Sequence, residues 1–179
     1  MSNEDTSLLF DIRRSVRYHD RRTAHFDRLH RLTNLASILL AGVVLMELGG
    51  ERSPWWVRTF AVIGALLSAT DLVVGFSGRA NLHRNFKRRF VELEQEFHGG
   101  VDYDKLTQKR LTIEAEEPPI YRALDLLCHN EVAVSMGYDP KSQPGAFTPV
   151  PLHKRVTANW LHWSDAGYST SGGSAPTKI

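Results

Sequence analysis

The chain has 179 residues, with 22 basic and 20 acidic side chains and a formal charge of +2. This length fits one domain with a sizeable core, and the near balance of charge excludes a protein that is strongly basic overall. A single cysteine, Cys128, excludes an internal disulfide and a metal site built from several cysteines. We expect it to be a small buried apolar residue.

Residues 1–31 are predicted to form a cytoplasmic amphipathic basic helix. The stretch RRSVRYHDRRTAHFDRLHR, residues 13–31, carries seven arginines. On the opposite side, packing side chains recur at intervals of three and four, which is the helical period. This stripe consists of Leu8, Ile12, Val16, His19, Thr23, Phe26, His30 and Thr33.

The arginines of this helix are interpreted by their distance from the apolar segment that follows. Arg28 and Arg31 lie next to it and are expected to set membrane topology and to contact anionic lipid. Arg14, Arg17 and Arg21 lie farther away, and two interpretations of them stay open. They form a binding surface for an anionic cytoplasmic ligand, or they pair with acids on a returning helix. Those acids are Glu92, Glu94 and Glu96.

Residues 32–76 are predicted to form a transmembrane hairpin, with helices at about 32–49 and 55–76 joined by the turn GGERSP. A spanning helix needs about 20 mostly apolar residues. Trp55 and Trp56 stand at a segment end, where aromatic rings reach the headgroups, and basic residues flank the hairpin on its outer sides. Both termini are therefore expected in the cytoplasm. A soluble hairpin would need polar residues at helical spacing, but Ser37 is the only polar residue in 35–46.

Asp71 is the most informative residue of the hairpin, because an acid within a membrane costs about 2.5–3.5 kcal/mol on insertion scales. It shares a helix face with Gly64, Ser68 and Gly75. This face is either a packing seam, in which Asp71 bonds to Asn34, Ser37 or a flanking arginine, or the lining of a pore in an oligomer. Glu47 is read as an interfacial charge or as one member of a ring of acids. The candidate pore-lining residues are Asp71, Ser68, Gly64 and Glu47.

Residues 77–98 are predicted to form a cytoplasmic stalk helix that pairs with the first helix. Glycines at 75 and 78 are expected to bend it at the bilayer surface, and His98-Gly99-Gly100 ends it. Its apolar stripe is predicted to be Leu82, Phe86, Phe90, Leu93 and Phe97.

Residues 101–138 are predicted to form a cytoplasmic helical pair. The first helix, from about Tyr103 to Glu116, has Asp102 as its expected N-cap, and the second runs from about Ile120 to Met136. The apolar side of the second helix is predicted to be Leu124, Leu127, Cys128 and Val132.

Residues 139–179 comprise a proline-rich linker, a short aromatic and basic helix within HKRVTANWLHW, and a tail whose composition is typical of disorder in isolation. Lys154 and Arg155 stand near Trp160 and Trp163. Such a pattern fits a platform on which single-stranded nucleic acid stacks, or a segment that its tryptophans anchor to the rest of the protein.

The sequence lacks HExxH, CxxC, GxSxG and phosphate-loop motifs. His25, Asp27 and His30 share no metal-binding face, and no nucleophile is paired with a base. We therefore expect no enzyme, no catalytic residue, no metal ligand and no cofactor.

The stretches YHDRRTAHFDRLHRLT and FSGRANLHRNFKRRF, together with the Trp-Trp start and the acid of the second apolar segment, resemble the SLATT family over about residues 8–136. This resemblance implies a two-transmembrane effector of bacterial anti-phage defence, located in the inner membrane and controlled by a partner nucleotidyltransferase or a nucleotide sensor. It also implies a homo-oligomer, for which a tetramer is preferred.

The extension from residue 139 is similar to effectors of the Hailong type. That similarity implies an effector held closed by single-stranded DNA oligomers that the partner enzyme makes. A cyclic nucleotide is the alternative ligand. The candidate ligand-binding residues are then Arg14, Arg17, Arg21, Lys154, Arg155, Trp160 and Trp163.

The expected fold is thus an all-α membrane protein: a two-transmembrane helical hairpin extended by amphipathic cytoplasmic helices, with a cytoplasmic C-terminal helical region. The expected function is a pore that depolarises or permeabilises the membrane in response to a cytoplasmic ligand. The alternative is a non-conducting, membrane-anchored scaffold that recruits a partner through its coiled-coil stalk.

Overall fold

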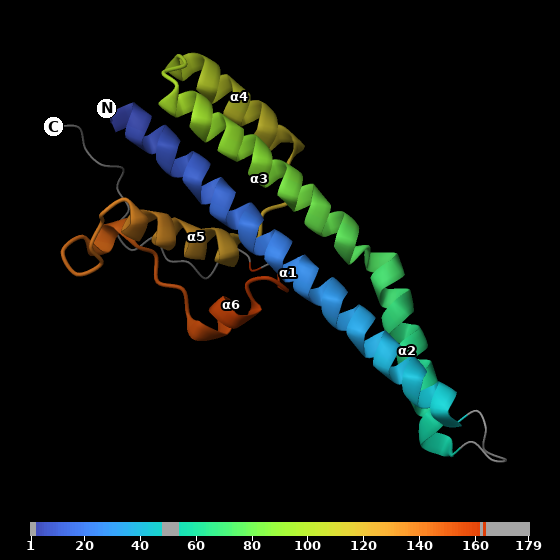
Figure 1. The fold of residues 1–179 in the computed structure, drawn as a ribbon. Helices are drawn as coiled ribbons and strands as arrows, with labels where there is room; N and C mark the ends of the chain where they lie inside the picture. Colours follow the sequence, from blue (N-terminus) through green and yellow to red (C-terminus); the bar gives the residue numbers. More distant parts are fainter. Residues whose placement is uncertain (1–2, 48–53, 162, 164–179) are drawn as a thin grey trace. The chain divides into compact units, whose positions relative to one another are not determined.

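The computed structural model describes residues 3–47, 54–161 and 163, and these residues contain helices and no strand. The all-α prediction is confirmed. Figure 1 shows the helices in chain order. They are α1 (Asn3–Glu47), α2 (Trp55–Val74), α3 (Phe76–His98), α4 (Tyr103–Glu116), α5 (Arg122–Ser135), the 3₁₀ helix η1 (Pro144–Ala146) and α6 (Leu152–Thr157).

The chain forms two compact units, each with its own contacts. The polar unit consists of Met1–Asp20 and Asn85–Ile179, and the hairpin unit is Arg21–Arg84. Helices α1 and α3 contribute residues to both units.

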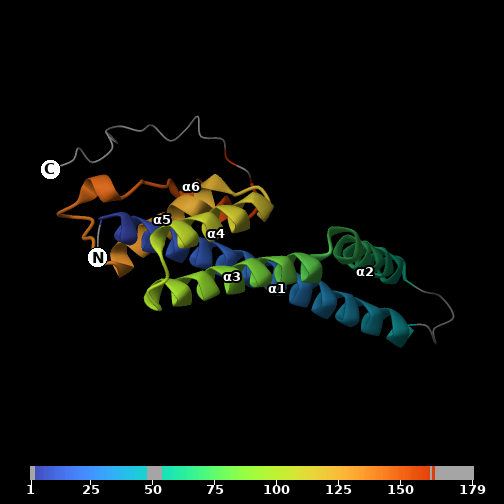
Figure 2. The ribbon, with the colours of Figure 1, turned by 90° about the horizontal axis from the view of Figure 1, so that it is seen from above.

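In the polar unit, α1 lies between two pairs of helices, α3 with α4 and α5 with α6 (Figure 1), and Figure 2 shows the same helices from above. On one side, Leu8 and Ile12 of α1 pack against Phe86 and Phe90 of α3 and Leu106 of α4. On the other side, Tyr18 packs with Ala123, Leu124 and Cys128 of α5 and with Ala158 after α6. The predicted stripe of α1 thus explains the first contact, and a second face of the same helix makes the other.

The hairpin unit has a small core of Phe26, Phe76 and Ala80. His83 is buried beside Phe26, with the two rings stacked at 5.7 Å between centroids, whereas Leu82 is 45% exposed. The prediction that Leu82 belongs to the apolar stripe is therefore wrong. A buried histidine takes the packing position because its ring stacks on a phenylalanine as an apolar residue would.

Helix α2 ends where Gly75 adopts a left-handed conformation, with φ of +65°, and α3 begins at the next residue. A side chain at Gly75 would be strained in this conformation. The expected bend is a complete break at Gly75, whereas Gly78 lies inside α3.

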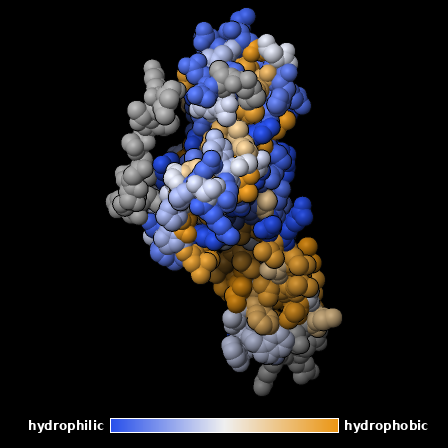
Figure 3. All heavy atoms as spheres, turned by 90° about the vertical axis from the view of Figure 1, so that its left-hand side faces the viewer, coloured by the Kyte–Doolittle hydropathy of each residue, from blue (hydrophilic) through white to orange (hydrophobic). Residues whose placement is uncertain are grey.

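Most apolar side chains of the hairpin helices are exposed or half-buried. Two helical stretches, Asn3–Met46 and Trp55–His98, are long and apolar enough to cross a membrane. In the most apolar 18-residue segment of each, 6% of the residues are buried. Apolar surface gathers over these helices in Figure 3. By length and composition, these two helices suggest association with a membrane.

The remaining helices differ from expectation in detail. Asp102 precedes α4 as predicted, but its side chain makes no capping hydrogen bond. The proline-rich linker contains η1. Helix α6 ends at Thr157, so Trp160 and Trp163 lie beyond it. The predicted tail falls mostly on 164–179, outside the described residues.

Candidate functional site

The hairpin unit carries a polar seam, which consists of His30, Asn34 and Ser37 of α1 and Ser68 and Asp71 of α2. His30 Nδ1 lies 3.0 Å from Asp71 Oδ2, and Asn34 Nδ2 lies 3.2 Å from His30 Nε2. This geometry fits an imidazole that donates to Asp71 from Nδ1 and accepts from Asn34 at Nε2. The sequence predicts a bond from Asp71 to Asn34, Ser37 or a flanking arginine, but the structure pairs Asp71 with His30.

The other contact across the polar seam is a hydrogen bond between two serine hydroxyl groups. Ser68 Oγ donates to Ser37 Oγ at 3.1 Å. Next to this bond, Gly64 and Ser68 line a groove of about 390 Å³ between the two helices. A Cβ at Gly64 would lie 3.4 Å from Leu40 Cβ, so the helices approach closely here. Glu47 is the last residue of α1, and its side chain falls outside the described part.

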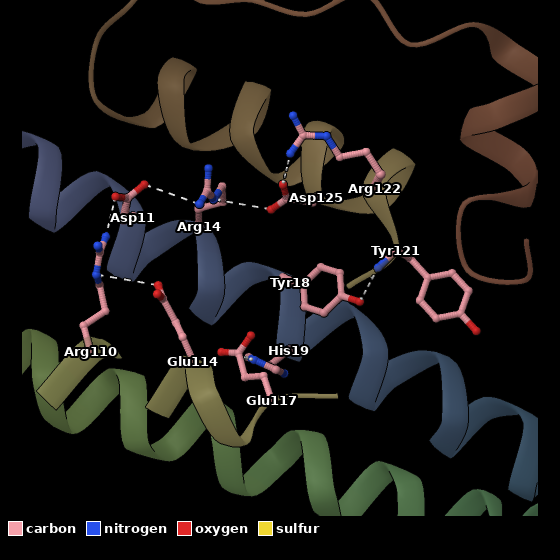
Figure 4. Close-up of polar contacts among 10 residues, drawn as sticks. All are labelled: Asp11, Arg14, Tyr18, His19, Arg110, Glu114, Glu117, Tyr121, Arg122 and Asp125. Atoms are coloured by element: carbon pink, nitrogen blue, oxygen red, sulfur yellow. Dashed lines mark hydrogen bonds and ion pairs between the residues drawn. The ribbon is translucent and has the colours of Figure 1, made fainter. Parts of the chain in front are cut away.

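Two of the three predicted ligand arginines of α1, Arg14 and Arg17, pair with acids other than Glu92, Glu94 and Glu96. Arg14 Nε lies 3.3 Å from Asp125 Oδ1 of α5, and Arg14 Nη2 lies 3.4 Å from Asp11 Oδ1 (Figure 4). Arg17 lies 3.7 Å from Glu131 of α5. Arg21, in the hairpin unit, is partly exposed.

The expected acids pair elsewhere. Glu94 accepts from Arg13 at 2.7 Å, Glu96 from Lys109 at 2.6 Å, and Glu92 lies 3.6 Å from Arg88. The face of α1 that carries Arg14 and Arg17 is turned to α5, and Arg13 meets α3 instead. The predicted pairing of Arg14 and Arg17 with α3 is therefore wrong.

A buried polar pair holds the segment between α4 and α5 against α1. His19 Nε2 lies 3.2 Å from Glu117 Oε1, and the side chains are 1% and 5% exposed. The imidazole is stacked on Phe86 and Phe90. One residue earlier, Tyr18 accepts a hydrogen bond from the backbone N–H of Tyr121 at 2.9 Å (Figure 4).

The sequence pattern did not predict the contacts of Glu117 and Asp125 with α1. Asp125 stands between Leu124 and Leu126, and an isolated acid within a predicted packing stripe indicates a buried partner. Glu117 ends the acidic stretch 114–117 and carries no such signal. His30 and Asn34 are four residues apart, so the pattern of helical faces could have found that contact.

Glu114 on α4 lies in an acidic setting near α1. Burial raises the pKa of its carboxyl, Glu117 and Asp11 raise it further, and Arg110 opposes them. Arg110 contacts both Asp11 and Glu114, the latter at 3.6 Å (Figure 4). This arrangement favours the protonated carboxyl more than water does.

The aromatic and basic residues near α6 do not form one surface. Lys154 is buried, with its ammonium 5.4 Å from the centre of the Trp163 ring, and Trp163 Nε1 donates to Thr157 at 3.1 Å. Trp160 and Arg155 are exposed. The anchoring interpretation therefore describes Lys154 and Trp163, whereas Trp160 and Arg155 face solvent.

One groove of about 840 Å³ brings together two of the predicted ligand residues. Arg17 of α1 and Arg155 of α6 both line it, with α5 and the linker supplying the remaining walls. Among the residues that the structure describes, no three His, Cys, Asp or Glu side chains could hold a metal ion.

No family model matches the chain, and no curated protein or solved structure matches it either.

Proposed function

We propose that this chain is a homo-oligomeric membrane effector whose hairpins together form an ion-conducting path. In this proposal it depolarises or permeabilises the bacterial inner membrane during anti-phage defence, under the control of a cytoplasmic nucleotide or single-stranded DNA oligomer. The observation that carries the proposal is an apolar hairpin, exposed on its outside, with a polar seam between its two helices.

The exposed side chains support a lipid environment. Leu39, Leu45, Leu72 and Val73 are 61–85% exposed. Burying apolar surface is favourable by about 25 cal/mol per Å², and patches of this kind mark protein or membrane contacts. The 20 residues of α2 give a length of about 30 Å, which is about the thickness of the hydrocarbon core.

The polar seam supports conduction rather than anchoring alone. An anchor needs no ionisable side chain, and ionisable residues inside a membrane usually line ion or proton pathways. The His30–Asp71 pair and the Ser37–Ser68 pair follow one another along the hairpin. A two-helix hairpin cannot enclose a pore, so the seam conducts only in an oligomer, for which a tetramer is preferred by resemblance.

The flanking charges support the orientation. Arg28, Arg31, Arg79 and Arg84 flank the two apolar segments at the ends away from the connecting turn, as expected when those ends are cytoplasmic. The resemblance to SLATT effectors supports the defence role and a partner nucleotidyltransferase.

The test is the conductance of the purified full chain in planar bilayers. Asp71→Asn keeps a group that can bond to His30 but removes the charge, and Asp71→Leu removes both. We expect both variants to change the unitary conductance or the ion selectivity while membrane insertion stays intact. Thr70→Asn is the matched control, because the exposed Thr70 hydroxyl bonds only to its own helix, at Leu66 O. It should conduct as the unmodified protein does.

Unchanged conductance in both Asp71 variants would remove the lining role. A correctly inserted oligomer that conducts nothing under any condition, and that retains a cytoplasmic partner, would support the scaffold instead.

A further inference from the structure

We propose that the groove between α1, α5, α6 and the linker is a binding site for a small amphipathic phosphate, meaning an organic phosphate attached to an apolar or aromatic body. Its role in gating rests on the proposed function, but binding itself does not. The groove lies entirely within the polar unit and has a volume of about 840 Å³. Sites for small organic ligands commonly span about 300–1,000 Å³.

The linker wall of the groove is fixed before any ligand arrives. The Asn130 side chain donates to Thr148 O at 2.8 Å and accepts from Thr148 N–H at 3.0 Å. His129 Nε2 lies 3.2 Å from Ala146 O. Because these contacts hold residues 146–148 against α5, a ligand need not order this wall, and the entropic cost of binding is reduced.

Two guanidinium groups give the groove its preference for anions. Arg155 is exposed, and within the described chain no carboxylate lies at ion-pair distance from it. Arg17 and Glu131 are 3.7 Å apart, with side chains 41% and 39% exposed. Such an exposed pair contributes about 0–1 kcal/mol, so an anion can displace Glu131 at little cost. Guanidinium groups bind phosphate with paired hydrogen bonds.

The rest of the lining requires an apolar body on the ligand. Leu127, Val134 and Phe147 line the groove, and Val134 is 56% exposed. Inorganic phosphate would leave these side chains in water, and a neutral apolar molecule would leave the two arginines unused. A phosphate carried on an apolar or aromatic group satisfies both parts of the surface.

The experiment measures binding by calorimetry to the full chain in uncharged nanodiscs. The probes are adenosine monophosphate and octyl phosphate, which separate a nucleotide source from a lipid-derived one. Inorganic phosphate tests the anionic half of the ligand alone. Adenosine and octanol test the neutral halves of the two probes. We expect at least one organic phosphate to bind at least tenfold more tightly than either of its halves, with an affinity that falls as salt rises.

The variants locate the binding. Arg17→Gln and Arg155→Gln should each weaken it at least tenfold, whereas Arg88→Gln, a 72% exposed arginine outside the groove, should not. Val134→Glu adds a carboxylate at an exposed position and should also abolish binding without a change in helix content. This variant keeps the test valid if an arginine variant folds poorly.

Tighter binding of adenosine monophosphate supports a nucleotide, and tighter binding of octyl phosphate supports a lipid-derived phosphate. The proposal is overturned if neither binds at millimolar concentration. It is also overturned if inorganic phosphate binds equally well, which means an adventitious ion only, or if the groove variants leave the affinity unchanged. Because conductance is not the readout, failure of the pore proposal leaves this result interpretable.

Discussion

The imidazole of His19 meets the carboxylate of Glu117 at 3.2 Å in a setting from which water is almost excluded. His19 belongs to α1, and Glu117 follows α4, so this contact and the neighbouring Tyr18–Tyr121 hydrogen bond fasten the α4–α5 connection to α1.

Glu117→Leu should lower the free energy of unfolding by about 1–3 kcal/mol, because it leaves the buried His19 nitrogen without its acceptor. The double variant His19→Phe and Glu117→Leu should recover part of this loss, since two apolar side chains replace the buried polar pair. Thermal unfolding of the full chain, followed by circular dichroism, measures both effects. Purely additive losses in the double variant would show that the two side chains are not coupled.

Arg14→Gln should destabilise the polar unit by about 1–3 kcal/mol, the range for removing one partner of a buried polar group, because Arg14 forms an ion pair with the buried carboxylate of Asp125. Asp125 is 8% exposed and would keep Arg122, at 3.2 Å, as its guanidinium partner. Arg88→Gln is the control, because an exposed pair four residues apart on one helix contributes about 0.3–0.5 kcal/mol. Equal shifts in the two melting temperatures would argue that Arg14 is not a structural residue and would return it to the ligand candidates.

Glu114→Gln should stabilise the protein at neutral pH. The folded state raises the pKa of the Glu114 carboxyl, chiefly through burial. The stability linked to this proton is therefore complete below the unfolded pKa and is lost as pH rises through the folded pKa. The melting temperature of the variant should exceed that of the unmodified protein at pH 7, and the difference should shrink as pH falls toward 4.5, the ordinary value for this group.

Glu116→Gln is the control of opposite sign. The hydrogen bond from Arg89 lowers the pKa of the Glu116 carboxyl, so its stabilising effect is present above the ordinary value and is lost as pH falls. At pH 7 the melting temperature of this variant should be lower than that of the unmodified protein. At acidic pH the two melting temperatures should be equal. The Glu114 explanation fails if both variants shift the melting temperature in the same direction at pH 7.

Gly75→Ala and Gly78→Ala should have opposite effects on stability. Neither added Cβ would meet another atom within 4 Å, so steric crowding does not distinguish them. At Gly75 the positive φ costs an L-residue about 1–2 kcal/mol. At Gly78, inside α3, alanine is favoured over glycine by about 1 kcal/mol. Differential scanning calorimetry of the two variants tests this difference. Stabilisation by Gly75→Ala would mean that α2 and α3 are continuous.

Much of the helical framework follows from the sequence. Tyr103–Glu116 is α4 at both ends as predicted, and α5 lies inside the predicted range from Ile120 to Met136. Glycine and proline residues set the ends of these helices, and the spacing of apolar residues sets which helix face is buried. Both are properties of neighbouring residues. For the same reason, the two apolar segments could be recognised without any knowledge of their partners.

The sequence-based predictions of burial and ion pairing were wrong for residues whose partners are distant in the chain. Leu82 and His83 both fit an apolar stripe, and only the position of Phe26 decides which is buried. Acids on several helices were possible partners of Arg14, and only the packing of α5 against α1 brings Asp125 to it.

The sequence by itself therefore determined which segments are helical, which faces are apolar and which residues carry charge. The tertiary structure alone decided that Asp71 bonds to His30, that Lys154 is buried beside Trp163, and that Arg17 and Arg155 share one groove. The physical reason is that helix formation depends on interactions within a few residues. The pairing of charges instead depends on distances between helices, which are fixed only when the whole core is packed.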